Sequence, residues 1–350
     1  MQHSDILIAG AGIMGLSLAL ELHHRGAHVT VVEQALPLSE ASTAAAGMLA
    51  AADPDNPPLL RPLSDLSISL YPAFLERLRS LSGIEVPLHT SETLQALPPH
   101  VPNSADVLSP DDLHRQLPQL TPGNHRFIHL NEHSLDPRQL AAALLASTRA
   151  AGIDLRTHTR VLSANSIGDT VEVSTAAGIV RAARFIDCTG AWAARVAPRK
   201  GQMLAVALPP ELPLRKVVRT PDIYIVPRAA GPTPIRVIIG ATVEDAGFDK
   251  TVHPADIARL QSKAAELLPA LATATILESW AGLRPATPDS LPLLGPTPNR
   301  AHHFLAAGHY RNGILLAPAT AHVMAQLITG ETASIDLAAF SPSRILAPGN

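Results

Sequence analysis

The sequence predicts a mixed α/β protein. A domain of alternating strands and helices is built from separated segments, and an antiparallel, β-rich α+β domain is inserted between them. Two patterns predict this fold. The first 34 residues read as strand, glycine-rich turn, helix and second strand, and residues 203–248 hold several apolar β segments without an intervening helix. With 350 residues, 46% of them hydrophobic, the chain is long enough for two domains.

The composition excludes several classes of function. The formal net charge is −3 and no basic run is interleaved with aromatic residues, so we expect no nucleic-acid partner. Cys188 is the single cysteine, which rules out an intramolecular disulfide and favours a reducing compartment. The apolar stretch 6–20 follows no basic segment, contains three glycines and is too short to span a bilayer. We therefore expect a cytoplasmic protein that does not bind membranes.

The N-terminal segment predicts a nucleotide-binding unit. Residues 5–9 form an apolar strand, residues 13–25 have apolar residues at helical spacing, and residues 28–32 form a second strand. Gly26 can end the helix, and Glu33 follows the second strand. The turn between the first strand and the helix reads GxGxxG. The sequence therefore has the dinucleotide-binding fingerprint in its full βαβ context.

Each residue of this fingerprint has a physical role. Gly10 permits the tight turn, Gly12 lets the backbone approach a pyrophosphate at the helix N-terminus, and Gly15 allows the helix to pack closely on the strand. Glu33 is placed to accept hydrogen bonds from an adenosine ribose, and its charge would repel the 2′-phosphate of NADP. The fingerprint does not distinguish FAD from NAD.

The segment EASTAAAGMLA, residues 40–50, favours a cofactor other than NAD. Ser42 and Thr43 are expected to cap a short helix, whose small residues would let the backbone approach a ligand closely. An NAD-dependent dehydrogenase would more simply continue into another βαβ unit, whereas a proline-rich loop follows here. The alternative is an ordinary alanine-rich helix start.

The rest of the chain predicts how the two domains are divided. Helices are expected over residues 136–150, with Asp136 as the cap and Pro137 in the first position, and over residues 254–268. Residues 184–196 should run from a buried strand through a glycine turn into a helix. Other β segments are expected at residues 153–162, 170–175 and 178–182. The predicted nucleotide-binding domain comprises residues 1–80, 134–200 and 277–335, the inserted substrate domain residues 81–133 and 201–276, and a tail residues 336–350.

Ordered motifs recur along nearly the whole chain. They are GAGIMG, VVEQ, ASTAAAGMLA, LDPRQLAAAL at 135–144, FIDCTGAWA at 185–193, KGQML at 200–204, YIVPR at 224–228, IIGATVEDAGFD at 238–249, GLRPATPDSLPLLG at 282–295 and GHYRNGILLAP at 308–318. Together they resemble the FAD-dependent amino-acid oxidases of the D-amino-acid oxidase group, and within it the glycine oxidase (ThiO) branch. Residues 52–130 contribute little to the resemblance.

The resemblance implies a reaction. The substrate would be a small amino acid, and hydride would pass from its α-carbon to N5 of a non-covalently bound FAD. The imine would hydrolyse to a 2-oxo acid and ammonia, and O2 would reoxidise the flavin and form hydrogen peroxide. For glycine the product is glyoxylate, or the imine can supply the synthesis of the thiamine thiazole. The resemblance leaves a homo-oligomer open.

Three residues are expected to act on the substrate. Arg284 lies at a strand end next to Pro285, and its guanidinium is suited to a bidentate grip on a carboxylate, the role implied by the resemblance. Its alternative role is a salt bridge to Asp289. Tyr224 would orient the substrate or be a half-buried strand aromatic, and Arg311 would balance charge near the cavity entrance or be a surface residue.

The stretch 308–321 places polar residues before an apolar helix over residues 314–328. The free N–H groups at a helix start stabilise negative charge, and the N1 and O2 atoms of a reduced flavin carry such charge. We therefore expect this helix start to bind the flavin. The expected cofactor-binding residues are Gly10, Gly12, Ile13, Met14, Gly15, Glu33, Ser42, Thr43, Ala46, Gly47, Met48, Val161, Thr189, Gly190, Trp192, His309, Tyr310, Arg311, Asn312, Gly313, Ile314 and Leu315.

Two positions depart from the family pattern. Val243 stands where glycine oxidases carry a larger thioether side chain, and Ala286 stands where the family frequently has glycine. These departures leave the preferred substrate open. The alternatives are an oxidase or dehydrogenase of sarcosine or D-proline, a flavoprotein subunit that passes electrons to a partner, and a plain NAD-binding module.

No metal site is expected. The chain has 16 histidines, and His125, His129 and His133 are spaced four apart. Residues 127–130 read as a strand, however, which would break a helical face, and no cysteine or carboxylate cluster accompanies these histidines or the pair His302–His303 at zinc spacing. Cys188 is expected to be a buried structural thiol rather than a point of covalent flavin attachment.

Overall fold

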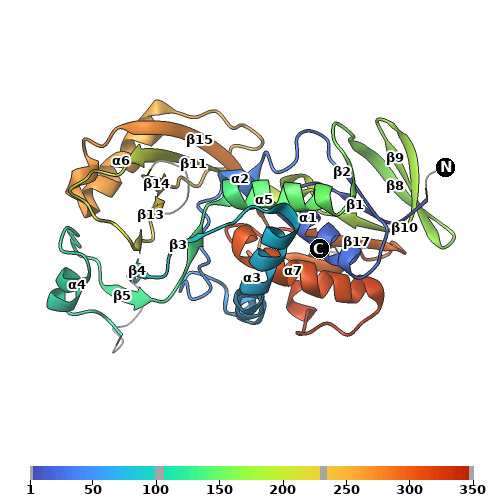
Figure 1. The fold of residues 1–350 in the computed structure, drawn as a ribbon, viewed down its shortest axis with the longest axis horizontal. Helices are drawn as coiled ribbons and strands as arrows, with labels where there is room; N and C mark the ends of the chain where they lie inside the picture. Colours follow the sequence, from blue (N-terminus) through green and yellow to red (C-terminus); the bar gives the residue numbers. More distant parts are fainter. Residues whose placement is uncertain (1–2, 99–105, 229–234, 347–350) are drawn as a thin grey trace.

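The computed structural model describes residues 3–98, 106–228 and 235–346. The chain forms two parts that lie end to end along the long axis of the molecule (Figure 1). One part surrounds a mostly parallel sheet near the N-terminus, and the other surrounds a mostly antiparallel sheet at the opposite end. The predicted fold class, an α/β domain with an inserted β-rich domain, is confirmed.

The first sheet orders its strands β16-β17-β10-β1-β2-β7, and β9 pairs with β10 and β8. The pairs β1–β10, β1–β2, β10–β17 and β2–β7 are parallel. Their bounds are β1 His3–Ala9, β2 Val29–Val32, β7 Asp154–Arg156, β8 Val161–Ile167, β9 Thr170–Thr175, β10 Gly178–Asp187, β16 Leu293–Pro296 and β17 His303–Ala307. A sheet that begins with β1 and β2 and ends with β17 is assembled from distant parts of the chain.

Helices cover one face of this sheet and a β hairpin the other. Ile6 and Ile8 of β1 pack with the helices α1, α3, α5 and α7, whereas Leu7 and Ala9 face Val171 of β9 and its neighbours. Side chains alternate along a strand, so burial on both faces explains why β1 is continuously apolar. The four helices are α1 Ile13–His24, α3 Arg61–Ser82, α5 Pro137–Ala150 and α7 Gly313–Thr329.

The second sheet orders its strands β15-β11-β14-β13-β12-β4-β5. All pairs are antiparallel except β12 with β4. The bounds are β4 Thr93–Ala96, β5 Phe127–Leu130, β11 Ala197–Ala207, β12 Val217–Arg219, β13 Tyr224–Arg228, β14 Arg236–Gly240 and β15 Ile276–Ala286. The apolar side of helix α6 (Pro254–Leu267), with Ile257 and Leu260, packs on this sheet. This β-rich part confirms the antiparallel pattern expected from residues 203–248.

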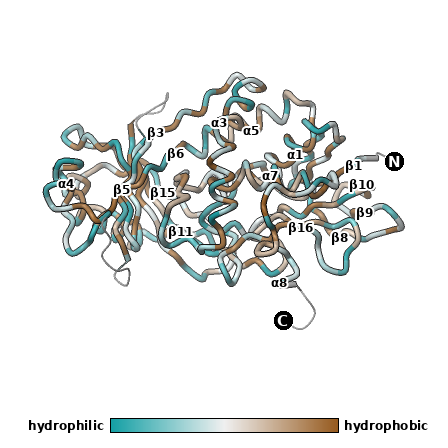
Figure 2. The backbone as a smooth tube through the Cα atoms, turned by 90° about the horizontal axis from the view of Figure 1, so that it is seen from below, coloured by the Kyte–Doolittle hydropathy of each residue, from teal (hydrophilic) through white to brown (hydrophobic). Residues whose placement is uncertain are grey.

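The remaining elements are short. They are the two-stranded sheet of β3 (Leu88–Thr90) and β6 (Ser134–Leu135), the helices α2 (Ala41–Ala44), α4 (Pro110–Gln116) and α8 (Ser343–Leu346), and the 3-10 turns η1 (Pro58–Leu60), η2 (Gly190–Trp192), η3 (Pro269–Leu271) and η4 (Ala338–Phe340). Figure 2 shows that apolar stretches concentrate on the strands and on α7, whereas α4, at the far end of the inserted part, is hydrophilic.

Two local predictions were wrong. The helix expected after the glycine turn at Gly190 is only the single turn η2, because the chain enters the long strand β11 five residues after Trp192. Ser42 and Thr43 do not cap α2: both lie inside it, and Glu40 occupies the cap position, where its side chain makes no capping hydrogen bond to the helix. By contrast, Asp136 caps α5 as predicted, because its carboxylate accepts the Arg138 N–H at 2.8 Å.

The two long strands β11 and β15 join the two parts of the molecule. The predicted domain boundaries at residues 200/201 and 276/277 fall within β11 and at the start of β15. Both strands belong to the second sheet by pairing, yet their ends at Ala197 and Ala286 pair with each other beside the first sheet. We keep the division into two domains as a proposal, with this strand pair shared by both.

Helix α7 contains a proline that removes one of its internal hydrogen bonds. Pro318 has no N–H, so the carbonyl of Ile314 loses its usual donor four residues later. The hydroxyl of Tyr71, from α3, donates to this carbonyl at 2.5 Å. Ser67, one helical turn earlier on α3, donates to the carbonyl of Leu315 at 2.6 Å. Tyr71 therefore satisfies the carbonyl that the proline leaves free. Ser67 also accepts the N–H of Ala319 at 3.2 Å, so both residues of α3 hold the first turns of α7 in place.

We predict that Tyr71→Phe lowers the free energy of unfolding by about 1–3 kcal/mol, because the buried Ile314 carbonyl is left without a donor. Urea unfolding of the two proteins measures the difference. Ser64→Ala is the matched control on the same helix, since the buried hydroxyl of Ser64 has no hydrogen-bond partner among the described residues. An equal loss in both variants would contradict the explanation.

Candidate active site

A cavity of about 250 Å³ lies where the two parts of the molecule meet. Its walls come from the start of α1, the segment 41–50, strands β11, β13 and β15, and the loop that leads into α7. The predicted site residues that line it are Gly12, Ile13, Met14, Ser42, Ala46, Gly47, Met48, Gly190, Tyr224, Arg284, His309, Tyr310, Arg311, Asn312, Gly313 and Ile314. The structure thus brings segments from the entire chain to one site.

The glycine-rich turn has the geometry that the fingerprint requires. Gly10 has a φ of +99° and lies against the carbonyl of Cys188, where a side chain would collide. A side chain on Gly15 would collide with the carbonyl of Gly10, so this glycine permits the close packing of α1 on β1. Gly12 lines the cavity at the N-terminus of α1. Only Gly12 of the three faces the cavity, because Gly10 and Gly15 shape the turn beneath it.

Ser42 has a role that the sequence did not indicate. Its hydroxyl oxygen accepts the N–H of Ile13 at 2.9 Å, so it satisfies a donor in the first turn of α1 rather than of its own helix. Thr43 faces away and donates to the Leu38 carbonyl at 2.8 Å. The contact explains why a small polar residue stands in an otherwise alanine-rich segment.

Glu33 lies at the carboxyl end of β2, beside the glycine turn. Its two carboxylate oxygens accept the backbone N–H groups of Ala11 at 2.8 Å and Ala35 at 3.0 Å. A carboxylate has about four acceptor positions, so two remain for hydroxyl groups of a ligand. Glu33 is outside the lining of the cavity, yet it stands where the fingerprint places a ribose-binding acid.

The first turn of α7 faces the cavity with free N–H groups. The helix's first internal hydrogen bond runs from the N–H of Leu316 to the carbonyl of Asn312, at 2.8 Å. The N–H groups of Gly313, Ile314 and Leu315 therefore have no partner within the helix. Its first turn contains no acidic residue. This helix end can stabilise an anion through its N–H groups and its dipole.

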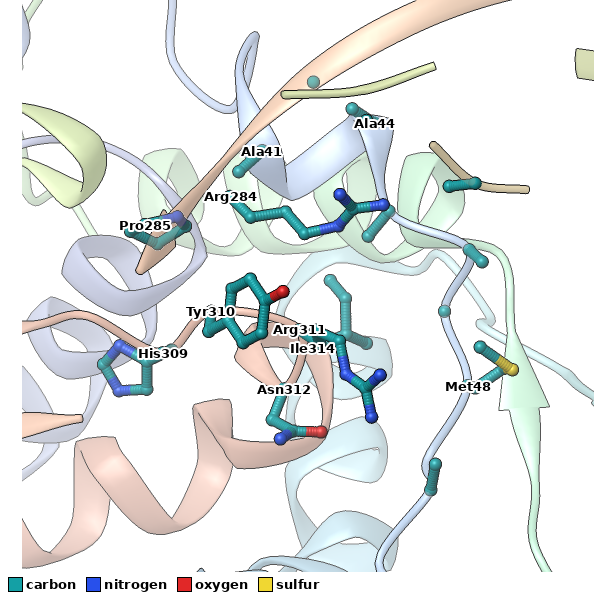
Figure 3. Close-up of a pocket in the computed structure, with 18 of the residues that line it drawn as sticks. Ala41, Ala44, Met48, Arg284, Pro285, His309, Tyr310, Arg311, Asn312 and Ile314 are labelled. Carbon is teal, nitrogen blue, oxygen red and sulfur yellow. The ribbon is translucent and has the colours of Figure 1, made fainter. Parts of the chain in front are cut away.

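Arg284 extends from β15 across the cavity toward the segment that holds Ala44 (Figure 3). The side chain fits only because Gly201, on the neighbouring strand, has no side chain at the position of the guanidinium. Its Nη1 donates to the carbonyl of Thr242 at 3.0 Å and lies 3.5 Å from that of Lys200. Among the described residues, no carboxylate lies within ion-pair distance of Arg284. The alternative salt bridge to Asp289 is wrong, because Asp289 pairs with Arg344 at 2.7 Å.

Tyr224 stands next to Arg284. Its hydroxyl donates to the sulfur of Met203 at 2.8 Å, and Gly240 on β14 leaves the space that the ring occupies. Burial raises the pKa of Tyr224, and the charge of Arg284 opposes that effect only in part. The hydroxyl therefore stays protonated at neutral pH and is available as a donor.

The loop before α7 distributes its side chains in different directions (Figure 3). Tyr310 has a φ of +47°, and its N–H donates to the Pro285 carbonyl at 2.8 Å. His309 is buried and its Nε2 lies 3.0 Å from the Thr320 hydroxyl; burial lowers its pKa to about 3, so it is neutral. Arg311 lines the cavity but is exposed, and it pairs with Asp53 at 3.3 Å. The loop thus carries a buried neutral imidazole (His309), a phenol ring (Tyr310) and a guanidinium (Arg311).

The predicted residues Val161, Thr189 and Trp192 lie outside the cavity lining, whereas Met14 and Met48 belong to it. Val161 is the first residue of β8 and packs against the apolar cluster that contains Val32. It lies outside the cavity lining. Thr189 donates to Asp187, which fixes the turn before η2. Trp192 is 42% exposed and stacks on Phe248 with ring centroids 5.2 Å apart, so it joins the two parts of the molecule outside the cavity.

Several residues of the site were missed by the sequence analysis. The indole of Trp280 donates to the Ala44 carbonyl at 3.0 Å, and Arg228, which is fully buried, donates to the carbonyl of Ala46. Both hold the segment 44–46 against the cavity. Arg228 ends the YIVPR motif, so the motif contained a signal. The acid Asp53 and the buried Arg219, which also line the cavity, lie in or beside stretches without recognisable pattern.

The structure also bears on the alternatives of metal and covalent chemistry. Among the described residues, no group of three or more His, Cys, Asp or Glu side chains could hold a metal ion. His129 instead pairs with Glu92 at 3.0 Å, and His133 lies 3.1 Å from the carbonyl of Thr90. Cys188 is buried at the cavity wall, and burial raises the pKa of its thiol. No helix of the described residues combines the length and apolar character that crossing a membrane requires.

Comparison with known proteins identifies the family. Residues 5–327 match the model of the DAO family, described as FAD dependent oxidoreductases. The chain is 38% identical to the bifunctional protein ThiO/ThiG of Trichormus variabilis over 97% of its own length and 55% of that protein, so it spans about half the length of this relative.

Two solved structures are similar over nearly their full length. Glycine oxidase from Geobacillus kaustophilus is 31% identical, with a TM-score of 0.91 over 98% of this chain and 99% of that one. Iminodiacetate oxidase from Chelativorans sp. BNC1 is 27% identical, with a TM-score of 0.83 over 96% of this chain and 98% of that one. The glycine turn, the free helix end and the family match agree, and the chain belongs to the DAO family of FAD-dependent oxidoreductases.

Proposed function

We propose that this protein oxidises glycine, or an amino acid of similar size, to the corresponding 2-oxo acid and ammonia, with O2 as the final electron acceptor. The observation that carries the proposal is Arg284, a cavity-lining cation whose hydrogen-bond acceptors are backbone carbonyls rather than a carboxylate. An amino acid supplies the missing carboxylate. The similarity to the glycine oxidase of G. kaustophilus supports the choice of glycine.

The chain fits FAD at the same site. Gly12 and the start of α1 would hold the pyrophosphate, Glu33 the ribose, and the first turn of α7 the flavin, whose anionic reduced form needs donors at this place. The bound flavin supplies the two-electron acceptor. The raised thiol pKa of Cys188 disfavours a thiolate that could attack the ring, which supports non-covalent binding.

The side chains of the cavity position the substrate. Arg284 would grip the carboxylate through two parallel hydrogen bonds, and the protonated Tyr224 hydroxyl would donate to the same group. Fixing the carboxylate fixes the α-carbon against the flavin side of the cavity, so orientation provides a large part of the rate enhancement. Neutral His309 would keep its hydrogen bond to Thr320 and take no proton. No catalytic base is required if the amine reacts in its neutral form.

The complete reaction balances. Glycine, O2 and water give glyoxylate, ammonia and hydrogen peroxide. The ThiO/ThiG relative supports a link to thiazole synthesis, in which the imine would be consumed before hydrolysis. That link and the single cysteine support action in the cytoplasm. The relatives support an oxidase that acts on glycine, a primary amine. They support it over an oxidase that acts on D-proline and over a subunit that passes electrons to a partner.

The test is peroxide production by the purified, yellow protein. Glycine, sarcosine, D-alanine and D-proline are offered in turn, and we expect the highest kcat/KM with glycine. Peroxide with D-proline alone would reverse the substrate assignment. If an artificial dye is reduced and no peroxide forms, the final electron acceptor is a compound other than O2.

Arg284→Ala should lower kcat/KM for glycine by about 10²- to 10³-fold, since the substrate carboxylate loses its charged partner. The variant should keep its FAD, which its absorbance spectrum shows. Arg199→Ala is the matched control: it lies opposite Arg284 in the strand register, but it is paired with Asp245 at 2.6 Å. Equal losses in both variants would remove Arg284 from its role.

Tyr224→Phe should lower kcat/KM by about tenfold, the effect of one hydrogen bond to a charged group. The raised pKa of Tyr224 means that its hydroxyl is protonated across the working range. The pH profile of kcat/KM between pH 6 and 9 should therefore keep its shape in the variant. A lost alkaline limb would instead assign that ionisation to Tyr224.

A further inference from the structure

The arginines that line the cavity differ in whether a carboxylate lies beside them. Three arginines line it: Arg219, Arg284 and Arg311. Within the described ranges, the contacts of the Arg284 guanidinium are backbone carbonyls and the hydroxyl of the neighbouring Tyr224. The other two share one carboxylate, because Asp53 Oδ2 lies 3.3 Å from Nη2 of Arg311 and 3.6 Å from Nε of Arg219.

A second carboxylate lies behind Arg219. Glu132 is 4% exposed, its Oε2 lies 3.0 Å from Nη2 of Arg219, and its Oε1 accepts the N–H of Ala52 at 3.0 Å. Arg219 is itself 4% exposed, and its Nη1 has no hydrogen-bond partner among the described residues. Buried charges of this kind are stable only when opposite charges compensate them.

The charges can be counted. Within the described part of the chain, three guanidinium groups of this cluster are opposed by the carboxylates of Asp53 and Glu132, which leaves one positive charge. A single carboxylate on the substrate restores neutrality, whereas a second would introduce an excess negative charge. Two further acids of the cavity lining are exposed: Asp55 and Asp222, the latter 3.4 Å from Lys263. Water screens their charges, and that of Arg311, whose side chain is 39% exposed, more than that of Asp53, whose side chain is 9% exposed. Arg311 is counted because it forms an ion pair with Asp53.

We propose that Asp53 is a specificity-determining residue, which restricts the site to amino acids with one carboxylate. This inference rests on the proposed function. A substituent on the substrate nitrogen or α-carbon that bears a second carboxylate would enter a cavity where Asp53 and Glu132 together already neutralise Arg219 and Arg311. Like charges in a poorly hydrated site repel strongly, so such a substrate is rejected. Without Asp53, Arg219 keeps Glu132 but Arg311 loses its ion-pair partner, so the cluster gains one net positive charge that can attract a second carboxylate.

Two N-substituted glycines test the proposal. Sarcosine carries an N-methyl group, and iminodiacetate carries an N-carboxymethyl group, so the pair differs by one carboxylate. In the wild type we expect the kcat/KM of iminodiacetate to be far below that of sarcosine. Asp53→Asn keeps the shape of the side chain and should raise the ratio of iminodiacetate to sarcosine by about tenfold or more.

Asp55→Asn is the matched control, because it removes the same formal charge from the exposed rim. It should leave the ratio unchanged. An equal rise in both variants would show that overall charge, and not Asp53, sets the preference. A purely structural role for Asp53 predicts a third outcome: kcat/KM falls by the same factor for both substrates, and the melting temperature falls with it. Either result overturns the proposal.

A binding measurement separates this inference from the proposed reaction. Acetate and malonate carry one and two carboxylates and are not oxidised. Their dissociation constants follow from the changes that they cause in the flavin absorbance. Wild type should prefer acetate and Asp53→Asn should shift the preference toward malonate, whether or not glycine is the substrate. An unchanged ratio of the two constants would refute the role of Asp53. Normal selectivity without glycine oxidation would refute only the proposed function.

Discussion

The pairing of β11 with β15 is the interaction on which the site depends. Both strands belong to the second sheet and pair over most of their length, with Gly201 opposite Gly282. Gly201 makes room for the Arg284 guanidinium, and Gly282 allows close contact with Ala44 of α2. The β11–β15 pair therefore positions the guanidinium of Arg284 and allows the small-residue segment 41–47 to lie close to the cavity. It also joins the two parts of the molecule, whose residues together line the cavity.

A second constraint fixes the opposite wall. Helix α7 begins at the cavity and contains Pro318, which breaks its internal hydrogen bonding one turn from its start. Tyr71 of α3 replaces the missing donor, and Ser67 of α3 donates to the next carbonyl. The role proposed for this helix end, binding the flavin, requires rigidity, because its free N–H groups must be oriented before the charge develops. Because of the proline, the start of α7 is hydrogen-bonded to α3, a helix from a distant segment of the chain.

Charge is distributed so that the pocket keeps one cation for a ligand. Arg311, Arg219 and Arg228 are all close to the cavity, and each is restrained by Asp53, Glu132 or a backbone carbonyl. Arg284 alone among the three that line the cavity lacks an acid. Neutral groups, the buried His309 and the protonated Tyr224, complete the surroundings. In the proposed function, recognition of a carboxylate would depend on Arg284, and the selectivity of the site on the acids around the other two arginines.

By itself, the sequence determined the elements with strong local signals. The GxGxxG turn, the strand and helix on either side of it and the cap at Asp136 depend on neighbours within a few residues, so pattern and spacing sufficed. The motifs around Arg284 and residues 309–315 likewise identified the polar groups of the cavity.

Only the tertiary structure decided how these groups are used. Ser42 caps a helix from another segment, Gly201 accommodates a side chain 83 positions away, and Tyr71 satisfies a carbonyl 243 positions away. Asp53, Glu132 and Arg219 meet through three separate parts of the chain. No local pattern encodes such contacts, because hydrogen bonding and charge compensation act through distance in space, and chain folding sets that distance.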